Sequence, residues 1–375
     1  MRGLAVLPAR GLAVLLAAVV AVGGCGHPLL PKSAASTPKT RAALGQSNLP
    51  ILGLGSPTPV LGVNLYALRN YPAAVVQADG ERTLGYIKHV LKADAVGIVW
   101  NFYAQNSYSD SVGITSATLS ARNVGILTRI AQRDHLLVEY RPLILVSGVQ
   151  NPWEGLINPY PPAGWFSNYY RAELPYLEMA QRLGVSEFVA ATELQDLNNS
   201  PLWPPFFAKI SSVYHGLVSY AAWDGNYFGS PPDRPLQDAT PQLLPVKYLG
   251  MDMYWHMTLP GNATKSDVTA AWQALFSKVP ASLLRRTAID ETGIQAQPNA
   301  YSDPGDLSAP GRLSEGVQVN WFAAACATVL RYHMRGVFFW KVDLTDSPAN
   351  PAKSLSTFEG RKGAAAISEC ARILH

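Results

Sequence analysis

The 375-residue sequence predicts a single (β/α)8 TIM barrel, and three observations lead to that prediction. Eight short apolar runs alternate with longer segments, several of which have helical periodicity. Most of the runs are apolar at nearly every position, as expected when both faces of a parallel strand are buried. No glycine-rich phosphate loop follows the first run, so the alternative, an open doubly wound sheet, is disfavoured. The barrel should occupy residues 59–375.

The expected strands are short and are spread along the whole of this region. They are Val60–Tyr66, Ala95–Asn101, Leu136–Leu145, Glu187–Glu193, Leu217–Trp223, Tyr248–Tyr254, Arg286–Glu291 and Gly336–Val342. Four helices have a clear pattern between them: Leu119–Gln132, Tyr169–Leu183, Asp267–Ser277 and Ser314–Tyr332. Gly184 follows the second helix, at the position where a glycine commonly ends one.

The composition argues against several classes of function. The formal charge is +4, and no block of basic residues stands out, so we expect no nucleic-acid partner. No cysteines and histidines have metal-ligand spacing, so we expect neither a metal nor a cofactor. The 9 Trp and 17 Tyr residues suit either core packing or stacking against sugar rings. We expect a monomer.

Residues 1–24 have the features of a signal peptide. Arg2 and Arg10 precede an apolar run that is shorter than the about 20 residues of a membrane helix. The run ends in Val-Gly-Gly-Cys25, which resembles a bacterial lipobox; the alternative is an ordinary secretory signal with an incidental cysteine. The resemblance implies that Cys25 is lipidated and anchors the protein to the outer face of the cytoplasmic membrane. Residues 25–58 then predict a flexible tether.

Two further cysteines remain. Cys326 lies on the expected helix Ser314–Tyr332, and Cys370 lies on a last helix expected after the eighth strand; the two helices should be neighbours. An exported protein can oxidise such a pair. The sequence leaves two possibilities open, a disulfide or two buried thiols.

Two glutamates are the candidate catalytic residues, because each stands where an apolar strand opens into its loop. Glu193 ends the fourth strand and Glu291 ends the seventh. In this type of barrel the active site lies at the carboxyl ends of the strands. Cleavage of a glycosidic bond needs one carboxyl group to protonate the leaving oxygen and another to attack or stabilise the anomeric carbon. One such glutamate alone would more often be an ion-pair or capping residue, but the pair favours a hydrolase.

The order of these motifs resembles clan A of the glycoside hydrolases and, within it, the β-mannanase-like family 113. The resemblance covers residues 60–375 and rests on Tyr140-Arg141-Pro142, Trp153-Glu154-Gly155, Thr192-Glu193-Leu194, Glu291-Thr292-Gly293 and Phe338-Phe339-Trp340. It implies an endo-acting, retaining hydrolase of a β-linked polysaccharide, with Glu193 as acid/base and Glu291 as nucleophile. Two positions depart from the pattern: Thr192 replaces a common Asn, and Arg141 replaces the family's Lys. They leave open how the sugar 2-hydroxyl is held and whether mannose is preferred.

The resemblance also implies roles for neighbouring residues. Arg141 would keep Glu291 ionised, Tyr254 would hydrogen-bond to Glu291, and Trp340 would form the floor beneath the reacting sugar. Asp290 should point away from Glu291, because side chains alternate along a strand. The other expected substrate contacts are Asn64, Trp100, Asn101, Thr192 and Trp255, with Trp153, Trp165 and Trp223 as weaker candidates.

Two other functions remain possible at this stage. The same chemistry could act on a glycan of the producing organism's cell envelope. Alternatively, the protein could be a non-catalytic lipoprotein that captures sugars. The presence of both Glu193 and Glu291 disfavours a pure binding protein, because binding needs neither an acid nor a nucleophile.

Overall fold

The computed structural model describes residues 58–147, 153–229, 246–349 and 354–375. The expected signal peptide, Cys25 and the tether up to residue 57 lie outside these ranges. Within them, no helix combines the length and the apolar character that a membrane span requires.

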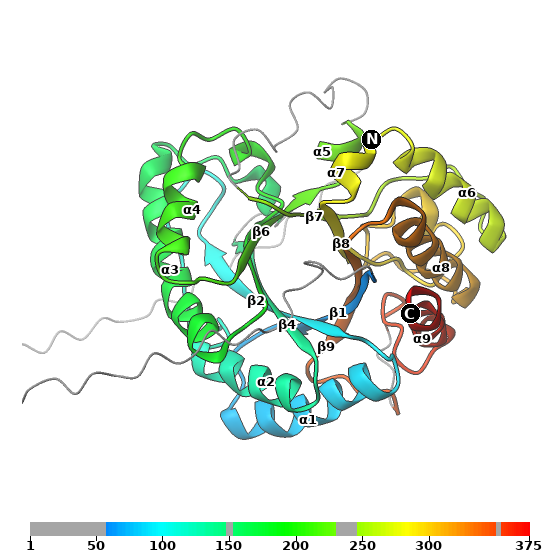
Figure 1. Cartoon of the computed structure of the whole chain (residues 1–375), viewed down its shortest axis with the longest axis horizontal. Helices are drawn as coiled ribbons and strands as arrows, with labels where there is room; N and C mark the ends of the chain where they lie inside the picture. Colours follow the sequence, from blue (N-terminus) through cyan, green and yellow to red (C-terminus); the bar gives the residue numbers. More distant parts are fainter. Residues whose placement is uncertain (1–57, 148–152, 230–245, 350–353) are drawn as a thin grey trace, which may run out of the picture. The chain divides into compact units, whose positions relative to one another are not determined.

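Eight parallel strands form a closed ring (Figure 1). They are β1 (Val60–Ala67), β2 (Ala95–Ala104), β4 (Leu137–Val146), β5 (Glu187–Thr192), β6 (Leu217–Trp223), β7 (Leu249–Asp252), β8 (Thr287–Thr292) and β9 (Gly336–Asp343). The ring closes because β1 pairs with both β2 and β9. The short strand β3 (Val112–Gly113) pairs antiparallel with the end of β2 and is not part of the ring. The predicted (β/α)8 fold is confirmed.

Helices surround the ring (Figure 1). They are α1 (Ala73–His89), α2 (Ala121–Arg133), α3 (Pro162–Leu183), α4 (Trp203–Ser211), α5 (Gly225–Phe228), α6 (Lys265–Phe276), α7 (Ala281–Leu284), α8 (Glu315–Tyr332) and α9 (Lys362–Leu374). Short 3-10 turns precede or follow some of them: η1 (Glu154–Leu156), η2 (Gln195–Leu197) and η5 (Ala300–Ser302). Gly184 adopts a φ of 64° and ends α3, as predicted. Helix α1 was not anticipated, because its buried face includes Gly80 and Thr83 and gives a weak hydrophobic pattern.

Helix α3 begins at Pro162, seven residues before the predicted start. Proline is well suited to this first position, since its missing N–H would have had no partner within the helix. Aromatic residues then pack between α3 and the barrel. Trp100 of β2 stacks on Tyr176 at 4.5 Å between ring centres, and Trp165 stacks on Tyr169 at 4.9 Å. These two tryptophans therefore belong to the layer between strands and helices.

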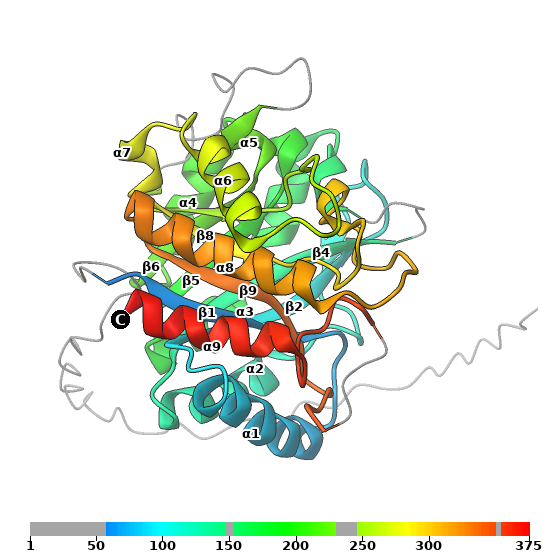
Figure 2. The same ribbon diagram turned by 90° about the vertical axis from the view of Figure 1, so that its right-hand side faces the viewer.

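A disulfide joins Cys326 on α8 to Cys370 on α9. The two helices lie side by side (Figure 2), and the Cα atoms of the cysteines are 5.8 Å apart. Of the two possibilities left open by the sequence, the structure contains the disulfide.

Candidate active site

A cavity of about 580 Å³ lies where the strands end, and both candidate catalytic glutamates line it. Its walls come from the loop after β4, from β6, β8 and β9, and from the segments that follow β5 to β8. The lining residues are Trp153, Glu193, Trp223, Asp224, Tyr254, Trp255, His256, Glu291, Gly305, Leu307 and Trp340. Of the ten residues expected to catalyse or to bind substrate, the cavity therefore collects Glu193, Glu291, Tyr254, Trp255 and Trp340.

Glu193 occupies an unusual backbone conformation directly after β5. Its φ is 51°, in the left-handed region that non-glycine residues seldom adopt. Two hydrogen bonds hold this conformation: its N–H donates to the Ala221 carbonyl at 2.8 Å, and its carbonyl accepts from the Gln195 N–H at 2.6 Å. Residues forced into such conformations concentrate at functional sites. Here the turn lets the chain leave the strand while the Glu193 side chain stays in the cavity.

The surroundings of Glu193 favour its protonated form. Burial raises its pKa well above the ordinary value, and the negative charges of Glu154 and Glu291 raise it further. The indole N–H of Trp153 donates to its Oε2 and opposes this rise only in part. Burial also raises the pKa of Glu154, to about 8. A carboxyl group kept protonated in this way can donate a proton to a leaving oxygen.

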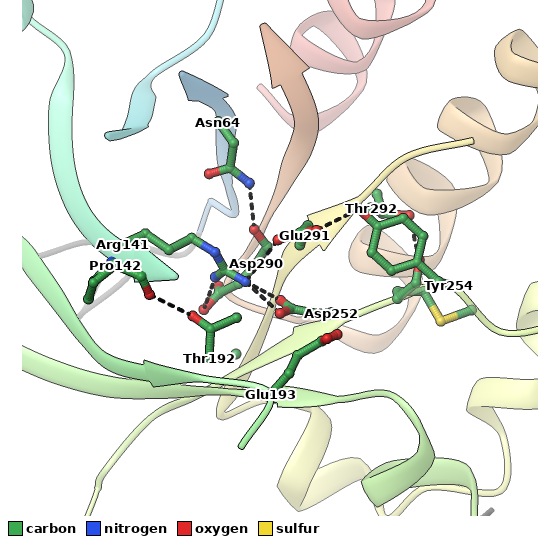
Figure 3. Close-up of polar contacts among 12 residues, drawn as sticks. Asn64, Arg141, Pro142, Thr192, Glu193, Asp252, Tyr254, Asp290, Glu291 and Thr292 are labelled. Carbon is green, nitrogen blue, oxygen red and sulfur yellow. Dashed lines mark hydrogen bonds and ion pairs between the residues drawn. The ribbon is translucent and has the colours of Figure 1, made fainter. Parts of the chain in front are cut away.

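The surroundings of Glu291 supply positive charge and hydrogen-bond donors instead. Arg141 Nη2 lies 3.2 Å from its Oε2, and the Tyr254 hydroxyl donates to its Oε1 at 2.7 Å. Burial raises the pKa of Glu291, but Arg141, Tyr254 and Lys341 all lower it. Burial and the Glu291 charge raise the pKa of Tyr254, so its hydroxyl keeps the proton that it donates. The expected contacts of Arg141 and Tyr254 with Glu291 are present (Figure 3).

Arg141 is fully buried and lies outside the cavity lining, but it contacts Glu291, which lines the cavity. Its Nη2 bonds both oxygens of Asp252, at 2.5 and 2.6 Å, and its Nη1 lies 3.8 Å from Asp290 Oδ2. The guanidinium thus faces three carboxylates, including Glu291. Figure 3 shows the side chain of Glu193, which follows β5, directed toward Asp252 and Glu291.

Asp290 does not point away from Glu291, so that prediction was wrong. Both side chains face Arg141, because β8 contains a bulge. Met251 of β7 pairs with Ile289, but the next residue, Asp252, pairs with Glu291. Asp290 is therefore the extra residue, and a bulge breaks the alternation of side chains. Gly250 makes room for it, since a Cβ there would lie 1.9 Å from Asp290 Oδ2.

Four of the expected substrate contacts lie outside the cavity lining and are buried. The Asn64 side chain donates to the Asp290 carbonyl at 3.0 Å, and Asn101 donates to the Tyr66 hydroxyl at 2.6 Å. The Thr192 hydroxyl donates to the Pro142 carbonyl at 3.4 Å. Trp100 faces the helices, where it stacks on Tyr176 of α3. These residues support the barrel, and the structure does not bring them to the site.

Aromatic side chains form much of the cavity wall, one of the two roles that the many Trp and Tyr residues suggested. Trp153 and Trp223 lie 5.6 Å apart between ring centres, and Trp255 packs against Phe228 at 5.4 Å. Of the weaker candidates, Trp153 and Trp223 line the cavity, whereas Trp165 is fully buried elsewhere.

Four lining residues were not among the expected contacts: Asp224, His256, Gly305 and Leu307. Asp224 follows directly after β6, a position that could have been noticed. Its carboxylate accepts from the Tyr254 N–H at 2.7 Å, and burial raises its pKa to about 7. Gly305 and Leu307 lie in the long segment between β8 and α8, and no local pattern distinguishes them.

A second acidic group lies deeper in the barrel. Carboxylate oxygens of Glu139, Glu187 and Asp290 lie within 4.8 Å of one another and could in principle hold a metal ion. Positive charge already faces them, because Arg335 Nη2 lies 3.1 Å from Glu187 Oε2 and Arg141 borders Asp290. We therefore assign no metal to this group.

Comparisons with known proteins agree with the fold. The model of Glycoside Hydrolase Family 113 matches residues 77–359. Among solved structures, a GH113 β-1,4-mannanase superposes with a TM-score of 0.70 at 14% identity, covering 84% of this chain and 99% of that one. The GH113 β-mannanase AaManA from Alicyclobacillus acidocaldarius gives 0.67 at 14%, covering 85% and 98%. An endo-1,4-β-mannanase from Rhizomucor miehei gives 0.53 at 11%, covering 85% and 96%. At these identities the likeness establishes the fold. No curated protein matches the chain significantly.

Proposed function

Because the chain belongs to glycoside hydrolase family 113, we propose that it cleaves β-1,4-linked mannan-type polysaccharides internally and with retention of configuration. The predicted family and the predicted glycoside hydrolase activity are confirmed by the family match. One observation supports the catalytic residues: Glu193 and Glu291 line one cavity, where the pKa of Glu193 is raised well above its ordinary value, whereas Arg141 and Tyr254 oppose the rise that burial causes in the pKa of Glu291.

The proposed reaction uses an ionised Glu291 and a protonated Glu193. The Glu291 carboxylate attacks the anomeric carbon, the glycosidic C–O bond breaks, and Glu193 gives its proton to the leaving oxygen. Glu291 is then an ester and has lost its charge, so the pKa of Glu193 falls, because that charge had raised it. The Glu193 carboxylate can now take a proton from water. The water oxygen attacks the same carbon and releases Glu291 as a carboxylate.

The substrate class is supported by the cavity and by the relatives. Aromatic walls suit the C–H faces of sugar rings, and three related solved structures are described as β-mannanases. Thr192 is turned into the barrel wall, so the sugar 2-hydroxyl must be held by another group. Arg141 is occupied by three carboxylates and is fully buried, so it acts through Glu291.

Attachment to the cell envelope is the second part of the proposal. The run before Cys25 and its match to a lipobox support lipidation of that cysteine, with the barrel on the outer face of the cytoplasmic membrane. Incorporation of a labelled fatty acid should occur in the wild type and be lost in Cys25→Ala. Equal labelling of both proteins would rule out this anchor.

A glycan panel tests the activity. The purified protein is incubated with β-mannan, β-glucan, β-galactan and cell-envelope glycans, and NMR follows the anomer released first. We expect the wild type and the surface control Glu178→Gln to release the β-anomer from mannan. Glu193→Gln and Glu291→Gln should release almost nothing. Equal release by all four proteins would reject these catalytic residues. Binding without hydrolysis would instead indicate a sugar-capture protein. Cleavage of the envelope glycan alone would show that this glycan, and not mannan, is the substrate.

A further inference from the structure

A layer of polar side chains crosses the barrel interior, deeper than the catalytic cavity. Asn64 of β1 pairs with Gly97 of β2. Gly97 pairs in turn with Glu139 of β4, which pairs with Glu187 of β5. In this fold such layers are normally filled by branched apolar side chains. A Cβ at Gly97 would lie 2.2 Å from Asn64 Oδ1 and 3.4 Å from Glu139 Oε1, so the glycine makes room for these polar groups.

The carboxyl groups of this layer outnumber the cations that contact them. Carboxylate oxygens of Glu139, Glu187 and Asp290 lie within 4.8 Å of one another, and all three residues are buried. Arg335 pairs with Glu187 at 3.1 Å, whereas Arg141 hydrogen-bonds two other carboxylates. No ion pair to Glu139 is present among the described residues. Since an unpaired buried ion is costly, Glu139 is the group that we expect to be neutral.

One proton would satisfy the acceptors that lack a partner. Neither oxygen of Glu139 has a hydrogen-bond partner in the described part of the chain, and Asp290 Oδ2 has none either. Two ionised carboxylates cannot bond each other, but a protonated carboxyl group can donate to a carboxylate. Burial raises the pKa of Glu139 well above its ordinary value, and the charges of Asp290 and Glu187 raise it further, against Arg141 and Arg335. Burial raises the pKa of Asp290 to about 7.

We propose that Glu139 is protonated and donates a hydrogen bond to Asp290 Oδ2. Glu139 is then a positioning residue for the nucleophile, and in this respect the inference rests on the proposed function. Arg141 Nη1 has no hydrogen-bond partner among the described residues and lies 3.8 Å from Asp290 Oδ2, whereas Nη2 contacts Glu291. With the proton in place, Asp290 needs no cation, and Arg141 stays directed at Glu291. Without it, Asp290 would draw the guanidinium toward itself.

The groups around the two glutamates show how one can act on the other. Glu139 faces Arg141, Glu187, Asp290 and Arg335. Glu291 faces Arg141, Glu154, Glu193, Asp252, Tyr254, Asp290 and Lys341. Arg141 and Asp290 belong to both sets, so they connect Glu139 to the nucleophile.

The pH profile of kcat/KM on an aryl β-mannoside tests this connection. Glu139→Gln keeps a donor to Asp290 and should leave the acidic limb, which reports Glu291, in place. Glu139→Leu removes the donor and should move this limb to higher pH by about one unit, because the hydrogen bond from Arg141 to Glu291 weakens. Adding Asp290→Asn to Glu139→Leu should move the limb back. Glu173→Leu is the matched control and should keep the profile, since Glu173 is equally buried but faces Tyr169 on α3.

Infrared spectroscopy tests the proton itself and needs no substrate. At neutral pH, Glu139→Gln should lose the C=O stretch of one protonated carboxyl group relative to the wild type. The surface variant Glu178→Gln should lose none. If Glu139→Gln retains the whole band, Glu139 is ionised and the inference is overturned, whatever the protein cleaves.

The kinetic outcomes decide the positioning role. An unchanged acidic limb in Glu139→Leu, or an equal shift in Glu139→Gln, overturns this role while the hydrolase assignment stands. If Glu139→Leu does not fold, Glu139→Asp withdraws the acid by one methylene and should shift the limb in the same direction; no shift would again overturn the role. If the wild type cleaves no mannoside, the proposed function fails and the positioning role fails with it, whereas the infrared result still decides the proton.

Discussion

The two catalytic carboxyl groups lie in one cavity, yet their surroundings differ in kind. Glu291 receives a guanidinium contact and a phenol hydrogen bond, from Arg141 and Tyr254. Glu193 receives one indole hydrogen bond and has a further acid, Glu154, close enough to raise its pKa. No ion pair to Glu193 is present among the described residues. Burial raises the pKa of both groups, so the difference comes from their neighbours.

This difference assigns the roles more firmly than the strand positions do. A group that must attack has to be ionised in the resting enzyme, and a group that must protonate has to be neutral. Arg141 and Tyr254 belong to β4 and to the segment after β7, whereas Trp153 and Glu154 belong to the loop after β4. Different neighbours therefore favour the two protonation states, although the charge of Glu291 also contributes to the raised pKa of Glu193.

The largest expected effects come from replacing the two glutamates. They can be told apart because only Glu193 acts by giving a proton to the leaving group. Glu193→Ala should lower kcat/KM about 10²- to 10⁴-fold for a substrate with a poor leaving group, the usual contribution of general acid catalysis. With a dinitrophenyl leaving group, which needs no proton, the first step should be nearly as fast as in the wild type. Glu291→Ala should be inactive on both substrates, because the attacking group is gone. Steady-state and burst kinetics on the two substrates measure this.

Added azide provides the control for that experiment. It should rescue Glu193→Ala by attacking the glycosyl ester, which gives a product of retained configuration. It should rescue Glu291→Ala only through direct attack, which gives the inverted product. An inverted product from Glu193→Ala and a retained product from Glu291→Ala would show that the two glutamates have the opposite roles.

Removing Arg141 should be the next largest change. Arg141→Met leaves Asp252, Asp290 and Glu291 as buried carboxylates without their cation, and breaking such a pair costs about 3–5 kcal/mol. The pKa of Glu291 should rise, because Arg141 lowers it, so the acidic limb of the kcat/KM profile should move to higher pH. Denaturant unfolding and a pH profile measure the two effects. Arg141→Lys should restore part of the stability and part of the wild-type pH profile. An unchanged acidic limb in Arg141→Met would show that Arg141 does not control the ionisation of Glu291.

The sequence predicted the barrel well, because its strands are buried on both faces and read as apolar runs. Leu217–Trp223 was predicted to the residue, and the ends of the other seven strands differ by three residues or fewer. The catalytic pair was recognisable because Glu193 and Glu291 interrupt such runs at their carboxyl ends. These features depend on local composition and on a general rule of the fold.

Residues whose position depends on register could not be predicted in the same way. The bulge at Asp290 is a pairing irregularity between β7 and β8 and leaves no local mark in the sequence. Trp100 was expected at the site because it stands near the end of the predicted strand, but its indole faces α3 and stacks on Tyr176. Leu307 reaches the cavity from a segment without regular structure. Each case needs the tertiary pairing, which one sequence does not show.

Removing the Tyr254 hydroxyl, which contacts Glu291, should lower kcat/KM by a smaller factor. Tyr254→Phe removes the 2.7 Å hydrogen bond to Glu291 Oε1. A hydrogen bond to a charged group contributes about 1.5–3 kcal/mol, so kcat/KM should fall roughly 10- to 100-fold. The acidic limb should also move to higher pH, since the bond lowers the pKa of Glu291. Tyr227→Phe is the matched control: it loses a buried hydroxyl that bonds the Gly250 carbonyl, outside the cavity lining, and should keep both values.

The smallest expected effect concerns the alkaline limb of the pH profile. Glu154→Gln removes a negative charge that raises the pKa of Glu193, so this pKa should fall. Glu193 must be protonated to act, and the alkaline limb of kcat/KM should therefore move to lower pH. The pKa of Glu154 itself is about 8, so its charge is present mainly on the alkaline side, where the change is read.

Trp153→Phe should move the alkaline limb of kcat/KM in the direction opposite to Glu154→Gln. The indole hydrogen bond lowers the pKa of Glu193, so its loss should move the alkaline limb to higher pH. Opposite shifts in the two variants, with no shift in Glu178→Gln, would show that Glu193 is the group that titrates there. Shifts in the same direction would mean that this limb reports another group. Asp224, whose pKa is about 7 and which lines the same cavity, would then be the next candidate.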